Sequence, residues 1–286
     1  MKRILIFLLL PLFTTGAIAQ TSIWKVSKGG KEVYLAGSVH ILKASDYPLP
    51  EEFDAAFALS QKVVFETDIG KLEDPQMAQT VMAKAMLEGD KTLSDILSEE
   101  VYKMLEEETA KMSIPLTALA RFKPAMVVVT MSGIQMQKMG ITSDGVDQFY
   151  YKKSNEEGKE IGFLETVEEQ LDVLMNMGKG NEDEFVKYSI SDMNNMGETL
   201  DELTATWRDG SSKVMKQQLK EMEDMYPGIY ESLLVNRNNN WMPQIENYFN
   251  DDQTEFVVVG SLHLHGKDGL LAMLKDKGYK VKQFNP

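Results

Sequence analysis

Two copies of the pattern Gly-Ser-x-His are the residues best suited to chemistry in this chain. The first copy runs from Gly37 to His40 and the second from Gly260 to His263, and an apolar run precedes each copy. The chain has three histidines, so the pattern holds two of them, and the third is His265. A histidine can bind a metal ion or carry a proton near neutral pH. We therefore expect both motif histidines to lie in one functional site.

Carboxylates end two other apolar segments. Glu66 follows Val63-Val64-Phe65, and Glu165 follows the apolar stretch 160–164. A carboxylate beside a buried strand costs free energy unless it is paired, coordinated or protonated, so Glu66 is a candidate metal ligand or general base. The alternative for Glu66 is a solvated charge just beyond the strand. Glu165 is a second candidate base, although the following Thr166 also fits an ordinary helix cap.

Arg237 is the remaining candidate for catalysis. It lies in the polar run Asn236–Trp241, and its guanidinium would suit a substrate carboxylate or a developing oxyanion. The alternative is a loop arginine in water. Asp68 ranks below Glu66, and His265 is either a supporting residue of the site or inert.

The elements that must position these residues form two similar units at the ends of the chain. The first unit has strands over 31–37 and 62–66 with a helix between them that begins near Pro50. The second has strands over 255–259 and 279–284 around a helix. We therefore predict an α/β fold with a mixed sheet and two strand–loop–helix–strand units, the first with a right-handed crossover between parallel strands. Ligand sites form at the carboxyl ends of parallel strands, where the candidate residues stand.

A large helical insertion is predicted between the two units, over about residues 70–250. A short strand over 160–164 interrupts it. Apolar periodicity and capping residues predict the helices 73–88, 94–111, 122–139, 145–157, 167–177, 181–207, 211–225 and 229–249.

The first 19 residues have the form of a cleaved signal peptide. Lys2 and Arg3 precede an apolar run over 4–13, and Ala17-Ile18-Ala19 has the small-x-small form of a cleavage site. We expect cleavage after Ala19, no stable membrane anchor, and a periplasmic or secreted protein. The alternative is a retained N-terminal anchor.

Composition excludes several classes of site and partner. The formal net charge of −14 repels nucleic acid and anionic lipid surfaces. The absence of cysteine excludes disulfides, thiolate metal sites and a cysteine nucleophile. The 19 methionines are scattered along predicted helices at core-like spacing, so we interpret them as packing residues.

The chain resembles the TraB/GumN family, which includes the Tiki-like proteases. The resemblance extends over about residues 22–283, and we expect residues 20–286 to form one domain of this kind. The family is marked by the two Gly-x-x-His motifs. The other matching segments are Tyr47-Pro48-Leu49-Pro50, Val63-Val64-Phe65-Glu66, Lys123-Pro124, Gly145-Val146-Asp147, Leu164-Glu165-Thr166, Arg237-Asn238, Trp241 and Gly269-Leu270-Leu271.

This resemblance implies a mixed sheet built from the two chain ends and a metal-dependent hydrolase. It also implies that His40, His263 and Glu66 bind a divalent ion, with manganese or cobalt in preference to zinc. The donor types alone suit all three metals. Asn236 stands where the family usually has a glutamate, which leaves that position without an acidic role here.

The leading hypothesis is an exported metal-dependent hydrolase that cuts peptide bonds in a peptide or protein substrate. Its ion would activate a water molecule, Glu66 or Glu165 would take the proton, and Arg237 would steady the developing negative charge. Two alternatives stay open. One is a protein that binds haem or a metal without catalysis. The other is a metal-free, esterase-like hydrolase with His40 as its base.

Overall fold

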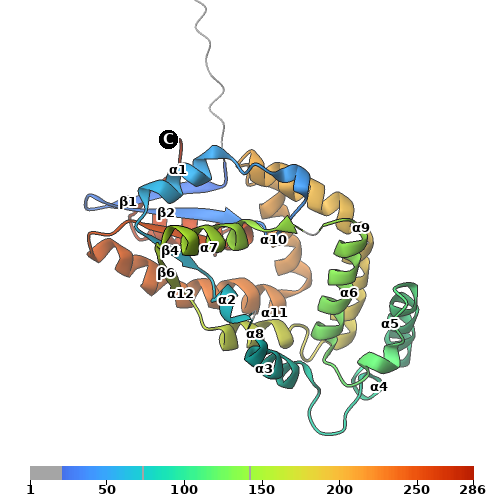
Figure 1. The fold of residues 1–286 in the computed structure, drawn as a ribbon. Coiled ribbons are helices and arrows are strands. Elements are labelled where there is room, and N and C mark those ends of the chain that lie inside the picture. The colour runs from blue at the N-terminus through green and yellow to red at the C-terminus, as the bar shows by residue number, and fades with distance from the viewer. Residues whose placement is uncertain (1–20, 73, 142) are drawn as a thin grey trace, which may run out of the picture.

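A mixed six-stranded sheet forms the centre of the molecule (Figure 1). The computed structural model describes residues 21–72, 74–141 and 143–286, so the expected signal peptide lies outside the described residues. The strands follow the spatial order β6-β4-β7-β2-β1-β8. Their bounds are β1 (Ile23–Lys28), β2 (Lys31–Ser38), β4 (Lys62–Phe65), β6 (Glu160–Phe163), β7 (Glu255–Gly260) and β8 (Lys280–Gln283). Two short strands, β3 (Ile41–Leu42) and β5 (Ser143–Asp144), pair separately.

The two chain ends are interleaved in this sheet. β7 pairs in parallel with β2 on one side and with β4 on the other, and β4 also pairs in parallel with β6. The outer strands β1 and β8 run antiparallel to each other, and β1 also pairs antiparallel with β2. The predicted α/β class with a mixed sheet from both ends is confirmed. The units do not stay separate, because β7 lies between the two strands of the first unit.

Strand β1 is absent from the sequence prediction, which begins the sheet at residue 31. Gly29 and Gly30 have φ values of 60° and 86° and form the tight turn between β1 and β2. A two-glycine turn between apolar segments is a hairpin signal, because both residues must adopt positive φ. The signal for β1 was therefore present in the chain.

Helices cover both faces of the sheet because its central strands are apolar on both sides. Alternation along the strands sends Val63 and Phe65 to one face and Val64 to the other. The first face packs against α1 (Glu51–Leu59) and α7 (Val146–Glu157). The second packs against α12 (Asn236–Asn247) and α14 (Leu270–Asp276), so α1 and α12 lie on opposite sides in Figure 1. Both layers bury the strand ends that carry the site.

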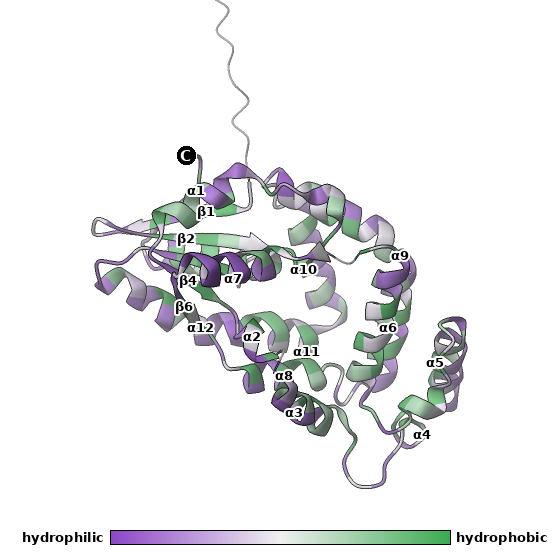
Figure 2. Cartoon of the chain, viewed as in Figure 1, coloured by the Kyte–Doolittle hydropathy of each residue, from purple (hydrophilic) through white to green (hydrophobic). Residues whose placement is uncertain are grey.

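The helical part of the chain has an apolar core of its own. This core joins α4 (Leu93–Ile96), α5 (Glu99–Lys111), α6 (Pro124–Lys138) and α9 (Glu182–Arg208). Met131 and Met193 are buried in it, in agreement with a packing role for methionine. Figure 2 shows hydrophobic residues on α4 and α6 and a mostly hydrophilic α7.

The remaining helices are α2 (Ile69–Leu72), α3 (Pro75–Ala85), α8 (Val167–Met175), α10 (Lys213–Met225), α11 (Pro227–Tyr230) and α13 (Ser261–Leu264), with single turns η1 (Ala44–Asp46), η2 (Leu116–Leu119), η3 (Glu231–Val235) and η4 (Tyr248–Asn250).

The helices agree closely with the predicted ones. The segment predicted as one helix over 94–111 is two helices, because Ser98 caps a new one at Glu99. Of the described helices, none combines the length and the apolar character that a membrane crossing needs.

Glu255, the first residue of β7, is a buried carboxyl group at the opposite end of the strand from the site. It is 1% exposed, and neither carboxyl oxygen has a hydrogen-bond partner among the described residues. Burial raises its pKa to about 7, Asp251 and Glu160 add to the rise, and Lys62 opposes it. The folded protein therefore holds this proton more tightly than the unfolded chain does.

The free energy of unfolding should accordingly fall as the pH rises from about 4.5 to about 7. Glu255→Gln should remove this loss, and should match the wild type at pH 4 but exceed it at pH 8 by up to about 3 kcal/mol. Urea denaturation across this range measures both proteins. Glu107→Gln, at an exposed position on α5, is the control and should differ from the wild type equally at both pH values. A constant difference for Glu255→Gln would contradict the prediction.

Candidate active site at the carboxyl edge of the sheet

Three of the candidate residues converge around Gly260. In-register pairing of β2 with β7 sets Ser38 opposite Gly260, so the two motif copies lie side by side. A Cβ atom built on Gly260 would lie 3.3 Å from His40 Nε2, 3.3 Å from Glu66 Oε1 and 3.6 Å from His263 Cδ2. Only glycine leaves this space open. The side chains that follow β2, β4 and β7 thus face one shared volume.

His263 is held from behind by Asn238. Its ring lies on α13 with 6% of the side chain exposed, and Nδ1 is 2.7 Å from Asn238 Oδ1. Asn238 Nδ2 donates to the carbonyl oxygens of His263 and Asp268, at 3.2 and 2.8 Å, which fixes the orientation of the amide. Nδ1 must therefore carry the proton. Burial lowers the pKa of His263 to about 3, although Glu66 opposes this.

His40 occupies a different setting from His263. It lies in the loop between β2 and β3, and 59% of its side chain is exposed. Its Nδ1 is 3.2 Å from Asp147 Oδ1 on α7 and 3.5 Å from Ser38 Oγ. Desolvation by the cleft walls lowers the pKa of His40, but Asp147 and then Glu66 outweigh it and raise the pKa to about 9.

Glu66 is buried and fully hydrogen-bonded, so the alternative of a solvated charge is wrong. Its side chain is 9% exposed. Oε1 accepts from the Gly260 backbone N–H at 2.7 Å, and Oε2 accepts from Arg237 Nη2 at 2.6 Å and from Gln170 Nε2 at 3.2 Å. Burial alone would raise the pKa of Glu66, but the positive charges of Arg237 and His40 and the hydrogen bond from the Gly260 N–H hold it well below its usual range. Glu66 is therefore an ionised acceptor.

Arg237 links Glu66 to Glu165. It lies in the first turn of α12, and 9% of its side chain is exposed, so it is not a loop arginine in water. Arg237 Nε and Nη2 donate to the two oxygens of Glu165, at 3.0 and 2.6 Å, in a bidentate pair. Burial raises the pKa of Glu165, and Arg237 opposes the rise. Trp241 Nε1 also donates to Glu165 at 3.2 Å. Glu165 therefore holds the guanidinium and makes no direct hydrogen bond to either motif histidine.

An irregular turn precedes this arginine. The segment η3 is a π-helical turn, and π-turns occur frequently at functional sites. Arg237 Nη1 donates to the carbonyl oxygen of Leu233 at 3.2 Å and lies 3.0 Å from His263 Nε2. Because arginine can only donate, His263 Nε2 must be the acceptor, which agrees with a proton on Nδ1.

Sequence reasoning missed three residues of the site. Asp147 and Asn238 stand in segments that carry the family resemblance, but their contacts depend on how α7 and α12 pack. Trp241 packs with its ring 4.5 Å from that of His263 and 4.6 Å from Arg237 Cζ. The weaker candidates lie elsewhere. Asp68 accepts from the Tyr151 hydroxyl, and His265 packs edge-on against Trp24 at 5.1 Å.

The donor set fits a divalent ion in the kind of its ligands but not in their present spacing. Two imidazoles and a carboxylate without thiolate suit zinc, manganese or cobalt. Metal-bound histidines commonly donate their other N–H to a carboxylate or a carbonyl, as the Nδ1 atoms of His40 and His263 face Asp147 and Asn238. In the described part of the chain, no three such donors close into a metal-binding cluster. Arg237 supplies the positive charge between Glu66 and His263 in this structure.

The fold and the site together define an α/β protein with a paired-histidine and carboxylate site at the carboxyl ends of parallel strands. The chain belongs to the TraB/PrgY/gumN family, whose model matches residues 22–283.

Two curated relatives differ in what their names state. YbaP, an uncharacterized protein of Escherichia coli K12, is 20% identical over 249 residues, which cover 86% of this chain and 89% of the relative. Metalloprotease TIKI2 of Danio rerio is 22% identical over 310 residues, which cover 88% of this chain and 58% of the relative. No solved structure gives a significant match.

The hydrogen bonds of Asn238 predict the tautomer of His263. Nitrogen NMR of the imidazoles should show a neutral ring with the proton on Nδ1, and only three histidines contribute signals. Asn238→Leu should remove the acceptor and shift the His263 signals, while those of His265 stay in place. A proton on Nε2 in the wild type would contradict the assigned network.

Gly145 is predicted to be intolerant of any side chain. A Cβ there would lie 2.2 Å from the carbonyl oxygen of His40 and 2.6 Å from its Cα. Gly145→Ala should therefore displace the His40 loop, lower the melting temperature and shift the His40 ring signals. Gly133→Ala is the matched control, because Gly133 lies in α6 with open space around it. It should stabilise the protein by up to about 1 kcal/mol. Equal behaviour of the two variants would contradict the close approach.

Proposed function

We propose that this protein is an exported, metal-dependent hydrolase that cuts peptide bonds. The proposal rests chiefly on the convergence of His40, Glu66 and His263 around Gly260. Asp147 and Asn238 orient the two histidine rings through their Nδ1 atoms, and Glu66 is kept ionised. A hydrolytic metal site requires both oriented imidazoles and an ionised carboxylate. The metalloprotease name of the TIKI2 relative supports this class of reaction.

Each residue of the site would have a separate role in hydrolysis. His40, His263 and Glu66 would hold a divalent ion, and such an ion lowers the pKa of a bound water and polarises a carbonyl group. Glu66 would accept the proton of the attacking water in exchange for its hydrogen bond from Gln170, whereas Arg237 holds both oxygens of Glu165. Arg237 would steady negative charge on the oxygen of the attacked carbonyl by exchanging its contacts with Leu233 and His263 for that oxygen. Glu165 fixes the direction of that guanidinium.

The signal-like residues 1–19 support export to the periplasm or beyond. An acidic mature chain without cysteine suits an oxidising compartment, because its folding needs no disulfide. Export is tested by sequencing the N-terminus of the protein recovered from the periplasm and the medium.

The three histidines supply a matched test of the site. His40→Ala and His263→Ala should each lower peptide cleavage by about a hundredfold or more. They should also lose the manganese, cobalt or zinc that the wild type retains after dialysis, measured by elemental analysis. His265→Ala, at a ring that packs on Trp24, should keep both properties. Circular dichroism confirms that each variant is folded.

Two results would contradict the proposal. One is cleavage by the wild type that survives complete chelation, which would favour the metal-free hydrolase with His40 as base. The other is a Soret band on haem addition that His40→Ala abolishes, without cleavage of any peptide, which would favour a binding protein.

A further inference from the structure

Two apolar pockets meet at the candidate active site. Pocket A has a volume of about 260 Å³ and lies among α9, α10, η3 and α13. Its apolar walls are formed by Val39, Leu203, Met215, Met222, Leu234 and Leu262. Pocket B has a volume of about 370 Å³ and lies near α2 and α8. Its apolar walls are formed by Phe65, Ile69, Leu72, Leu174 and Val258.

The residues common to both pockets belong to the site or adjoin it. They are Ser38, His40, Leu233, Arg237 and Gly260. Each pocket therefore opens from the same point, next to His40 and Arg237, and the two extend in different directions from it. A chain bound across His40 would have one pocket available on each side of the bond above the site.

The remaining surface at Arg237 differs in chemistry. A third, larger hollow lies on the Glu165 side of Arg237, and its walls carry the carboxylates Asp68, Glu165, Glu169 and Asp172. Apolar residues such as Phe163, Val167 and Val173 also line this hollow, but its four carboxylates make it less suited to an apolar side chain than pockets A and B. Water in such apolar hollows is displaced favourably by aliphatic or aromatic groups, at roughly 25 cal/mol for each Å² of apolar surface buried.

We propose that the two pockets select the substrate, and that it carries apolar side chains on both sides of the bond that is cut. This inference rests on the proposed peptidase function and specifies its substrate class. Leu203 and Met222 would contact the side chain on one side of the bond, and Leu72 and Leu174 would contact the side chain on the other. The preferred residues are leucine, methionine and phenylalanine, because the pockets offer apolar contact and no charged partner beyond His40, Glu66, Asp147, Arg237 and His263.

Binding can be measured without any cleavage by methyl NMR of the methionines in the mature protein loaded with zinc, which is diamagnetic. The probe is a short blocked peptide with adjacent leucines, compared with the same peptide with adjacent serines. The leucine peptide should shift the methyl signals of Met215 and Met222, which line pocket A. The serine peptide should shift them at least tenfold less at equal concentration.

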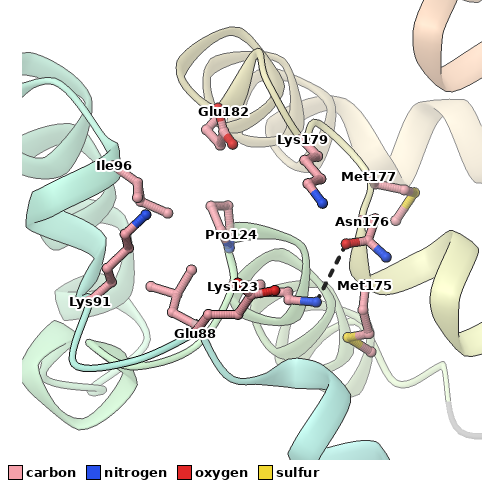
Figure 3. A pocket seen from close by; sticks show the side chains of 11 residues that line it. Glu88, Lys91, Ile96, Lys123, Pro124, Met175, Asn176, Met177, Lys179 and Glu182 are labelled. Carbon is pink, nitrogen blue, oxygen red and sulfur yellow. Dashed lines mark hydrogen bonds between the residues drawn. The ribbon is translucent and has the colours of Figure 1, made fainter.

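A separate pocket provides internal control signals. It has a volume of about 200 Å³ and lies in the helical region, where Lys91, Lys123 and Lys179 line it together with Met175 and Met177 (Figure 3). Lys123 Nζ lies 3.4 Å from Asn176 Oδ1 there. This pocket shares no residue with pockets A and B. The signals of Met175 and Met177 should stay in place for both peptides.

Three matched leucine-to-lysine variants test the specificity. With a peptide library, Leu203→Lys and Leu72→Lys should each lower kcat/KM for leucine at one substrate position by about tenfold or more, and favour aspartate or glutamate there. The two variants should act on opposite sides of the cut bond. Leu59→Lys, at a position on α1 that is 52% exposed and outside both pockets, should leave the preference unchanged.

The outcomes separate this inference from the proposed function. Methionine shifts with the leucine peptide, without cleavage of any library peptide, would overturn the peptidase function but support apolar recognition at His40. Cleavage without a preference for apolar residues, or a preference that neither lysine variant alters, would overturn the inference and keep the function. Shifts caused only by a fatty acid or haem would also overturn it.

Discussion

The in-register parallel pairing of β2 with β7 is the constraint on which the site depends. The two strands come from opposite ends of the chain, yet Ser38 pairs with Gly260, so the two Gly-Ser-x-His copies end at the same height in the sheet. A slip of one residue would turn every side chain of one strand to the other face. The size of Phe256 disfavours such a slip, because its ring packs against Phe57 and Tyr150, where a valine of β7 would leave a cavity.

A second constraint is electrostatic and is centred on Arg237. Two carboxylates, Glu66 and Glu165, share one guanidinium in a region where less than a tenth of each side chain is exposed. Buried charges are costly unless their hydrogen bonds are satisfied, and here nearly every polar atom has a partner. This network fixes the positions of the side chains in the site more than it adds to the free energy of unfolding. It keeps Glu66 ionised, directs its Oε1 toward Gly260 and gives His263 a neutral ring.

Much of the fold was accessible from the sequence, because strands and helices follow local periodicity and caps. The proximity of His40, Glu66 and His263 followed from a general property of parallel sheets, whose carboxyl ends meet at one edge. The acceptors behind the two histidines did not follow, because Asp147 and Asn238 reach the site only through the packing of α7 and α12. The unequal pKa values of the histidines arise from Asp147 beside His40 and from the burial of His263. The hairpin at Gly29 and Gly30 was missed although its signal is local.

The two acceptors behind the histidine rings have a consequence for how the site comes into being. Asp147 is 107 positions from His40 along the chain, and Asn238 stands on a helix that begins after more than 200 residues have been made. Neither ring can be held until segments from the middle and the end of the chain have docked on the sheet. A nascent or partly folded chain therefore has no assembled site, and the site forms only when folding is complete.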